Sequence, residues 1–451
     1  MWKRIIIAAL FLISTVTVVA IETAVTGPGR IAGNLITTAL CYALLFLFLC
    51  RFHRDVLGVV RKTAFILAII MLFVLAARLV TATGNTNLIN IIPFALIPVL
   101  VTVFYDSRLA MLILLVTLML CCFMPGSSYG FFFINLTAGM AAMLSLSGIN
   151  SKNRLHRSAP VIIAVCAIAC TAVAVHKTGS LGSITTGEYR WFIINGLLIF
   201  MACPAIALFE KRFYFLSDAT MLELSDSRHP LLKKFSEQAP GSYQHSLQVA
   251  NLAEAASRAT GANILLARTG ALYHDIGKMV SPEYFIENQR GEHNPHSHLD
   301  PGESSRIIIG HVAEGVKLAA QYKLPVQITD FIRMHHGTTK AYFFYRKYLE
   351  LKKIRKGDET LFTYAGPKPF SAETAIVMMA DAVEAASRTL DRHTEEDIAT
   401  VIDSAIMLQE QDGQYSDSPL TFRNITQIKE AFQTRLMEMH HARIAYPADS
   451  R

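Results

Sequence analysis

Cysteine is absent from the second half of the chain. All seven cysteines lie in the first 203 of 451 residues, at positions 41, 50, 121, 122, 166, 170 and 203. The second half therefore has neither a disulfide framework nor a cysteine-based zinc site. Any metal site there must use His, Asp and Glu.

Charged residues are also scarce, at 17% of the chain, whereas hydrophobic residues make up 52%. This composition is too apolar for an ordinary soluble protein and indicates segments that lie in lipid. The apolar excess ends near residue 210, where charges of both signs begin to mix. We therefore predict a transmembrane domain over residues 1–209, a linker over 210–229 and a globular domain over 230–447.

Eight apolar runs have spanning or near-spanning length. The first, Ile5–Ile21, has no clear small-residue cleavage site after it, so we interpret it as an uncleaved helix. A cleaved signal peptide is the alternative, and it would leave seven spans. The other runs are 31–50, 63–83, 88–105, 109–124, 130–148, 159–176 and 191–209. The sequence thus predicts a polytopic helical bundle of about eight spans.

Basic residues predict the orientation of these spans. If the amino terminus lies inside, the inner segments carry 12 Lys and Arg residues and the outer loops carry 3. This asymmetry is typical of cytoplasmic loops, so we expect the second half of the chain in the cytoplasm. Cytoplasmic loops also account for the net charge of +7, and no polymeric nucleic acid is predicted as a partner.

From residue 210 the sequence shows helical patterns and few strand signals, which predicts an all-α fold. Asn263 and Asp300 are expected to begin helices, and Gly277 and Gly337 to end them. The expected helices are 241–261, 263–277, one from 300, 325–337, 373–390, 395–410 and 422–441.

Seven metal-type side chains fall on inward faces or near the ends of these helices: His245, His274, Asp275, His311, His335, His336 and Asp381. A lone histidine on an apolar face is more often a hydrogen-bonded core residue. Burying seven titratable groups without a cation is unfavourable, however, and one or two divalent ions would offset that cost. Imidazole and carboxylate ligands suit iron, manganese or zinc.

The order of these residues carries a resemblance. His245, then His274-Asp275, then Asp381 resembles the HD superfamily of metal-dependent phosphohydrolases, and the added histidines resemble its two-metal members. Eight longer motifs resemble the seven-transmembrane HD family, whose PgpH-type members are bacterial cyclic di-AMP phosphodiesterases. These motifs are Ala239–His245, Val249–Glu254, Tyr273–Lys278, Tyr284–Asn288, His335–Thr338, Tyr364–Pro369, Ala380–Ala386 and His441–Pro447.

The resemblance implies an enzyme of the bacterial cytoplasmic (inner) membrane that hydrolyses cyclic di-AMP to linear pApA in second-messenger signalling. It implies two divalent transition metals, iron or manganese, bridged by Asp275. One ion would be held by His245, His274 and Asp381, and the other by His311, His335 and His336. Hydrolysis of another nucleotide such as cyclic di-GMP, or nucleotide binding without catalysis, are the alternatives. Homodimer formation is left open.

Substrate contacts are expected around this centre. Lys278 is predicted to act in catalysis and to contact a phosphate, and Arg388 is either a phosphate contact or a surface cation. Further predicted contacts are Asn288, Thr338 and the aromatic stretch Tyr342–Tyr345, whose rings could stack on a base. The histidines of the polar loop 290–298, including His296, are either substrate-facing or solvated. One feature departs from the family: only about residues 26–30 separate the first two spans, where typical members carry a large extracytoplasmic domain.

Overall fold

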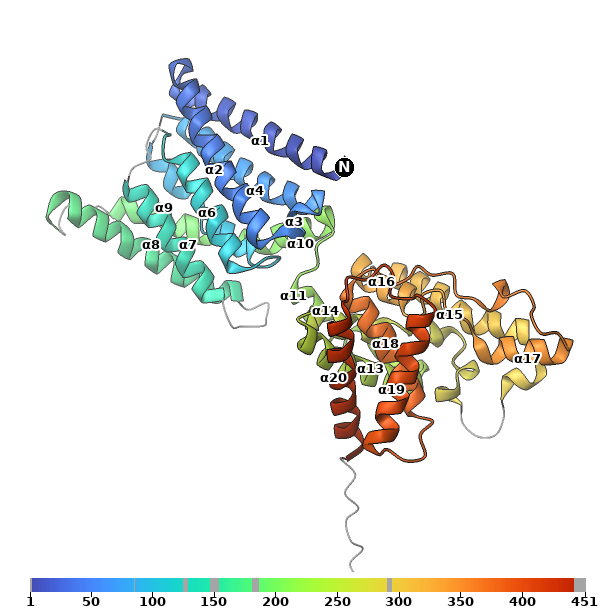
Figure 1. Ribbon diagram of the computed structural model, residues 1–451. Helices are drawn as coiled ribbons and strands as arrows, with labels where there is room; N and C mark the ends of the chain where they lie inside the picture. Colours follow the sequence, from blue (N-terminus) through green and yellow to red (C-terminus); the bar gives the residue numbers. More distant parts are fainter. Residues whose placement is uncertain are drawn as a thin grey trace, which may run out of the picture. The chain divides into compact units, whose positions relative to one another are not determined.

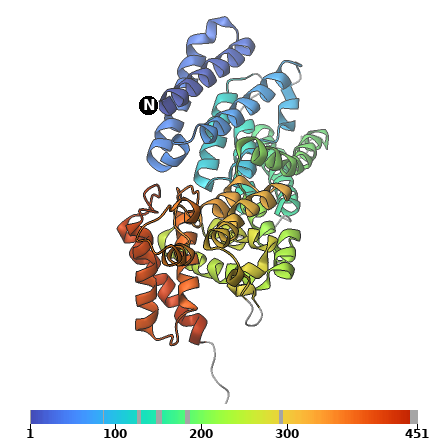
Figure 2. The ribbon, with the colours of Figure 1, turned by 90° about the vertical axis from the view of Figure 1, so that its right-hand side faces the viewer.

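The computed structural model describes residues 2–84, 86–124, 129–146, 154–180, 186–289 and 294–441. Over these ranges the chain forms helices and connecting segments, and a single isolated bridge, Lys340 to Thr363, is the β pairing present (Figures 1 and 2). The all-α prediction is confirmed. Predictions for His293 and residues 442–447 lie outside the described residues. Two compact units, Met1–Ala219 and Thr220–Arg451, make up the chain, and the predicted domain borders stay predictions.

The first unit consists of apolar helices. Within the described ranges, four are long and apolar enough to cross a membrane: Trp2–Ala24, Pro28–Phe52, Val60–Thr81 and Ser158–Thr178. A fifth candidate is a pair bent by 43°, Arg190–Met201 with Pro204–Phe213, and three shorter apolar helices accompany them. The α-helices are α1 (Trp2–Thr26), α2 (Ile31–Phe52), α3 (Arg54–Leu57), α4 (Val60–Thr81), α5 (Leu96–Val101), α6 (Ser107–Cys121), α7 (Tyr129–Leu146), α8 (Arg154–Thr178), α9 (Thr186–Leu198) and α10 (Ala202–Phe213). The count of eight spans stays a prediction.

The predicted run 88–105 is not one continuous helix. A 3-10 segment, η2 (Thr86–Ile91), precedes the six-residue α5. Pro93 lies between them and disfavours helical backbone at the residue before it, which explains the break. Between α1 and α2 the chain has only Gly27, whose φ is 90°, and one 3-10 turn, η1 (Pro28–Arg30). The short connection agrees with the sequence interpretation.

The second unit holds the remaining helices. They are α11 (Asp218–Leu224), which begins at the end of the first unit, α12 (Pro230–Gln238), α13 (Pro240–Thr260), α14 (Ile264–Tyr273), α15 (Pro301–Gln321), α16 (Val326–Met334), α17 (Tyr342–Lys352), α18 (Ala372–Ser387), α19 (Glu395–Gln411) and α20 (Phe422–His441). Side chains of Asn263 and Asp300 accept backbone N–H groups at the starts of α14 and α15, as predicted. Helix α17 was not predicted.

The core of this unit is built around α13. This helix packs against α14, α18 and α20 through a buried face that includes Val249, Leu252 and Ala256 (Figure 1). On α14, Gly270 lies against the ring of Phe331, where an added Cβ would come within 2.4 Å of ring carbon. The missing side chain therefore allows α16 to approach α14, and both helices end at the predicted metal centre.

Candidate metal centre

The structure brings all seven predicted ligands together. Their ligand atoms form three overlapping groups, each within 4.8 Å: His245 with His274 and Asp381, His274 with Asp275 and His335, and His311 with His335 and His336. These side chains come from five helices or from their C-terminal ends, α13, α14, α15, α16 and α18, which are far apart in sequence. Six of the seven residues are buried, and His336 is half-buried.

Asp275 lies at the centre of the cluster. Its Oδ2 is 3.3 Å from His274 Nε2 and 3.6 Å from His245 Nε2. Its Oδ1 is 3.3 Å from His311 Nε2 and 3.5 Å from His335 Nε2. Each carboxylate oxygen therefore faces a different group of ligands, which is the geometry that a bridging carboxylate requires.

In the group of His311, His335 and His336, the Nε2 atoms of two rings face each other. His311 Nδ1 donates to the Ile308 carbonyl at 2.6 Å, and His335 Nδ1 donates to the Ile332 carbonyl at 3.0 Å. In neutral rings these bonds leave both Nε2 atoms as lone-pair acceptors. The two Nε2 atoms are nevertheless 3.1 Å apart and buried. A cation between them would turn this repulsion into ligation.

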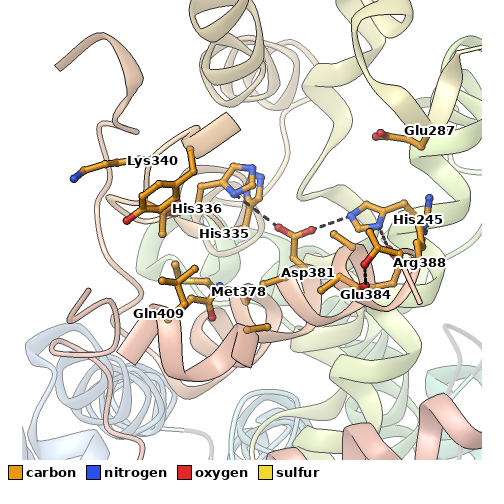
Figure 3. Close-up of a pocket in the computed structure, with 18 of the residues that line it drawn as sticks. His245, Glu287, His335, His336, Lys340, Met378, Asp381, Glu384, Arg388 and Gln409 are labelled. Atoms are coloured by element: carbon orange, nitrogen blue, oxygen red, sulfur yellow. Dashed lines mark hydrogen bonds and ion pairs between the residues drawn. The ribbon is translucent and has the colours of Figure 1, made fainter. Parts of the chain in front are cut away.

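The other group repeats this arrangement. His245 Nδ1 donates to Glu384 Oε2 at 2.5 Å, so a neutral ring presents the lone pair of Nε2 to Asp381 Oδ1, 2.9 Å away (Figure 3). His274 Nδ1 donates to the Ala271 carbonyl at 2.6 Å, which also leaves its Nε2 as an acceptor. His274 Nε2 and both carboxylate oxygens of Asp275 are buried without a hydrogen-bond partner. These unsatisfied acceptors fit divalent cations of the kind that imidazole and carboxylate bind.

Both adjacent ligand pairs lie where an α-helix ends. Helix α14 ends at Tyr273 and α16 at Met334, so His274 and His335 are C-cap residues, and Asp275 and His336 lie beyond the helices. The sequence predicts all four residues within helices, where the side chains of neighbouring residues point about 100° apart. Because α14 and α16 end before the positions that the sequence predicts, the 100° separation of helical neighbours does not apply to these pairs. Both members of each pair face the cluster.

Lys278 is held by two carboxylates. Its Nζ is 2.7 Å from Asp275 Oδ2 and 2.9 Å from Glu287 Oε1, and Glu287 also accepts a hydrogen bond from the Ser242 hydroxyl at 2.7 Å. Burial alone would raise the pKa of the Asp275 carboxyl, but the ammonium group of Lys278 holds it well below its usual range. Burial likewise opposes ionisation of Asp381, but when the rings of His245 and His274 also carry a proton on Nε2, their hydrogen bonds keep the pKa of Asp381 well below its usual value. Both carboxyls are thus kept as carboxylates.

A cavity of about 740 Å³ opens onto the cluster. Three of the predicted contacts, Lys278, Tyr342 and Arg388, line it. The ligands that line it are His245, His335, His336 and Asp381. Arg388 donates two hydrogen bonds to Glu384 Oε1, at 2.8 and 2.6 Å.

Four other predicted substrate contacts do not line this cavity. Asn288 binds the backbone N–H groups of Gly241 and Ser242, and His296 Nε2 lies 2.9 Å from the Tyr284 carbonyl. Thr338 bonds to Gln414, and Tyr345 packs against Phe362. The substrate roles of Asn288, His296, Thr338 and Tyr345 stay predictions.

Sequence reasoning missed Glu384 and Glu287. Glu384 lies three residues after Asp381 and four before Arg388 on α18, so helical spacing could have placed it on the same face. Glu287 follows from no local pattern, because it reaches Lys278 from a 3-10 turn, η7 (Ile286–Asn288).

Comparison with known proteins matches one family model in each half of the chain. A family model described as 7TM receptor with intracellular HD hydrolase matches residues 29–217, and one described as HD domain matches residues 242–386. The protein named cyclic-di-AMP phosphodiesterase PgpH from Bacillus subtilis is 39% identical over 325 residues, which cover 69% of this chain and 44% of that protein. Its namesake from Listeria monocytogenes is 32% identical over 400 residues, or 86% and 54% of the two chains.

This chain belongs to the 7TM-HD family. The apolar helices of the first unit and this membership show that it is a membrane protein, and the predicted resemblance is confirmed. The crystal structure of the L. monocytogenes PgpH HD domain in complex with cyclic-di-AMP is 41% identical, with a TM-score of 0.46, and covers 48% of this chain and 99% of that domain. The chain spans about half the length of the curated relatives it matches.

Proposed function

We propose that this 7TM-HD protein is a metal-dependent phosphodiesterase that hydrolyses cyclic di-AMP to linear pApA at the cytoplasmic face of a bacterial inner membrane. The observation that carries the proposal is Asp275, whose two oxygens face two separate groups of acceptor ligands. Such a site suits two divalent transition ions, iron or manganese, held by His245, His274 and Asp381 on one side. His311, His335 and His336 supply the other side.

When bound there, two divalent ions would supply Lewis acidity to a phosphodiester and lower the pKa of water. The protein contributes the arrangement of its own groups. Lys278 balances the charge of Asp275 and lines the cavity, where its ammonium group attracts a phosphate anion. Lys340 and Arg388 add positive charge to the same cavity. Addition of water across one P–O3′ bond yields a free 3′ hydroxyl and a 5′ phosphate, which is pApA.

The choice of adenine rests on the relatives, since phosphate-binding groups do not distinguish bases. Two PgpH proteins that align with most of this chain are named for cyclic di-AMP, and the related HD domain was crystallised with it. Beyond the metal cluster, the cavity also offers the carboxylate of Asp412 and the aromatic ring of Tyr342. An aromatic ring can stack on a base, and a carboxylate group can bond to its edge.

The test is a hydrolysis panel with the purified full chain in detergent, loaded with Mn²⁺ or Fe²⁺. We expect conversion of cyclic di-AMP to pApA, resolved by chromatography, and slower turnover of cyclic di-GMP. Preference for cyclic di-GMP would refute the substrate and leave the reaction class standing. Failure to cut either nucleotide with both metal sites filled would favour a nucleotide-binding receptor.

A further inference from the structure

Helix α17 and the turn after it concentrate positive charge on one edge of the second unit. Residues 340–356 contain seven basic residues and one acidic residue, whereas the rest of Thr220–Arg451 contains 19 basic and 28 acidic residues. We call the exposed part of this segment the basic edge. It comprises Tyr342, Phe343, Arg346, Glu350, Leu351, Lys352, Lys353, Ile354, Arg355 and Lys356.

The charge of the basic edge is not balanced within the unit. Lys340, which precedes the basic edge in the chain, forms an ion pair with Glu359 at 2.5 Å. Among the residues that the structure describes, by contrast, Arg346, Lys352, Lys353 and Arg355 have no ion-pair partner. Uncompensated cations that lie close together on a surface attract polyanionic partners.

Large apolar side chains are interleaved with these cations. Phe343 is 71% exposed, Leu351 63% and Ile354 41%. The opposite face of α17 is buried, because Phe344 and Tyr345 form a small core with Phe362. The helix is therefore held in place by one face while its apolar and basic groups point outward.

We propose that the basic edge docks on an anionic lipid surface of the membrane that the first unit spans. Lysine and arginine next to exposed Phe, Leu and Ile is the composition of interfacial helices, which bind anionic headgroups and insert apolar side chains between them. The spans of the first unit keep the bilayer at high effective concentration. A single-stranded nucleic acid would instead call for stacking surfaces, which Leu351 and Ile354 do not provide.

Docking would act on the catalytic cavity, because Lys340 and Tyr342 line it and lead directly into α17. A bilayer that holds α17 would restrain this wall of the cavity. Lipid charge is thereby linked to substrate access. The inference rests on the proposed cytoplasmic placement of the unit, but not on its catalytic activity.

The experiment uses the full chain in lipid nanodiscs with one tryptophan as reporter. The chain has two tryptophans, Trp2 and Trp191, so Trp2→Phe and Trp191→Phe remove the background and Phe343→Trp adds the probe. In discs that contain phosphatidylglycerol we expect a blue-shifted emission and several-fold stronger quenching by brominated lipid than in phosphatidylcholine discs. High salt should reverse both effects.

Reversing the charge of the basic edge distinguishes binding of the edge to anionic lipid from mere proximity of the tryptophan probe to the bilayer. Lys352→Glu, Lys353→Glu and Arg355→Glu together should abolish the difference between lipids, whereas Lys233→Glu with Lys234→Glu on α12 should not. Equal quenching in both lipids, or quenching that survives the triple reversal, would overturn the proposal. So would a probe that responds to single-stranded RNA but not to phosphatidylglycerol. Because the readout needs neither metal nor turnover, a catalytically inactive protein would still report docking.

Discussion

At the scale of single residues, Asp275 is the group on which the proposed centre depends. Its side chain is buried, forms an ion pair with Lys278 Nζ and has a separate set of imidazole nitrogens near each oxygen. An amide in its place would keep the shape but lose the charge, and it would turn one oxygen into an N–H₂ donor. That donor would face the acceptor nitrogens of one ligand group.

We therefore expect Asp275→Asn to lose bound metal and to lower turnover by more than the roughly 10–100-fold typical of outer-shell changes. Metal per chain, measured by elemental analysis, and hydrolysis of cyclic di-AMP check this. Asp330→Asn, a half-buried carboxyl on α16 away from the cluster, is the matched control and should change neither. Full metal content and turnover in Asp275→Asn would refute the bridging role.

Glu384 is not one of the predicted ligands, but it contacts the predicted ligand His245. Its Oε2 accepts from His245 Nδ1, and its Oε1 accepts twice from Arg388. A carboxylate at this position keeps the proton on Nδ1 and leaves Nε2 free to ligate. We infer that Arg388 supports the ligand His245 through Glu384, which is a different role from the predicted phosphate contact.

Glu384→Gln should weaken metal binding by about 10–100-fold in a chelator competition titration, because the amide can also donate and so no longer selects one tautomer. Arg388→Ala should weaken metal binding to a smaller extent. If Arg388 instead contacts phosphate, its replacement will raise KM and leave metal affinity unchanged. The comparison of metal affinity with KM therefore separates the two roles.

At the scale of elements, the placement of the predicted metal ligands depends on the C-terminal ends of α14 and α16 and not on their central turns. Each helix stops just before a ligand pair, so that two adjacent residues face the same cluster. After His336 the chain turns at Gly337, whose φ is 51°. An added Cβ there would lie 2.4 Å from Gln414 Oε1, which accepts from the Thr338 backbone N–H.

Gly337→Ala should consequently destabilise the protein by about 1–3 kcal/mol through backbone strain and displace His336. Differential scanning calorimetry in detergent should show a transition lower by several degrees, together with reduced metal content. Gly310→Ala is the matched control, since this helical glycine has nothing within 4 Å of an added Cβ. Replacement at Gly310 should be neutral or slightly stabilising, and equal effects at the two glycines would contradict the argument.

At the scale of the whole molecule, the chain combines an apolar unit with a unit of mixed charge. The first supplies helices that can cross a membrane, and the second supplies the metal-type cluster. Access to an intracellular nucleotide requires the second unit to lie in the cytoplasm. The 12 to 3 distribution of basic residues predicts this orientation.

Reporter fusions after Arg212 should therefore be active as cytoplasmic reporters and inactive as periplasmic ones. A matched pair of fusions in the connection at Gly27, which is predicted to lie outside, should show the reverse. A periplasmic signal after Arg212 would refute the orientation and remove the proposed substrate from reach of the site.

The sequence by itself determined the helical class, most helix starts in the second unit and the identity of the clustered side chains. These depend on local properties: apolar periodicity, the capping side chains of Asn263 and Asp300, and the scarcity of groups other than His, Asp and Glu that could bind metal. The break before α5 also had a local signal in Pro93.

Only the tertiary structure decided which oxygen of Asp275 faces which histidines, and that Glu384 supports His245 from 139 positions away. It also decided that Asn288 caps α13 and lies outside the cavity lining. Such relations depend on how distant helices approach one another. That approach is set by the packing of whole side-chain layers, such as Gly270 against Phe331, and no single stretch of sequence contains it.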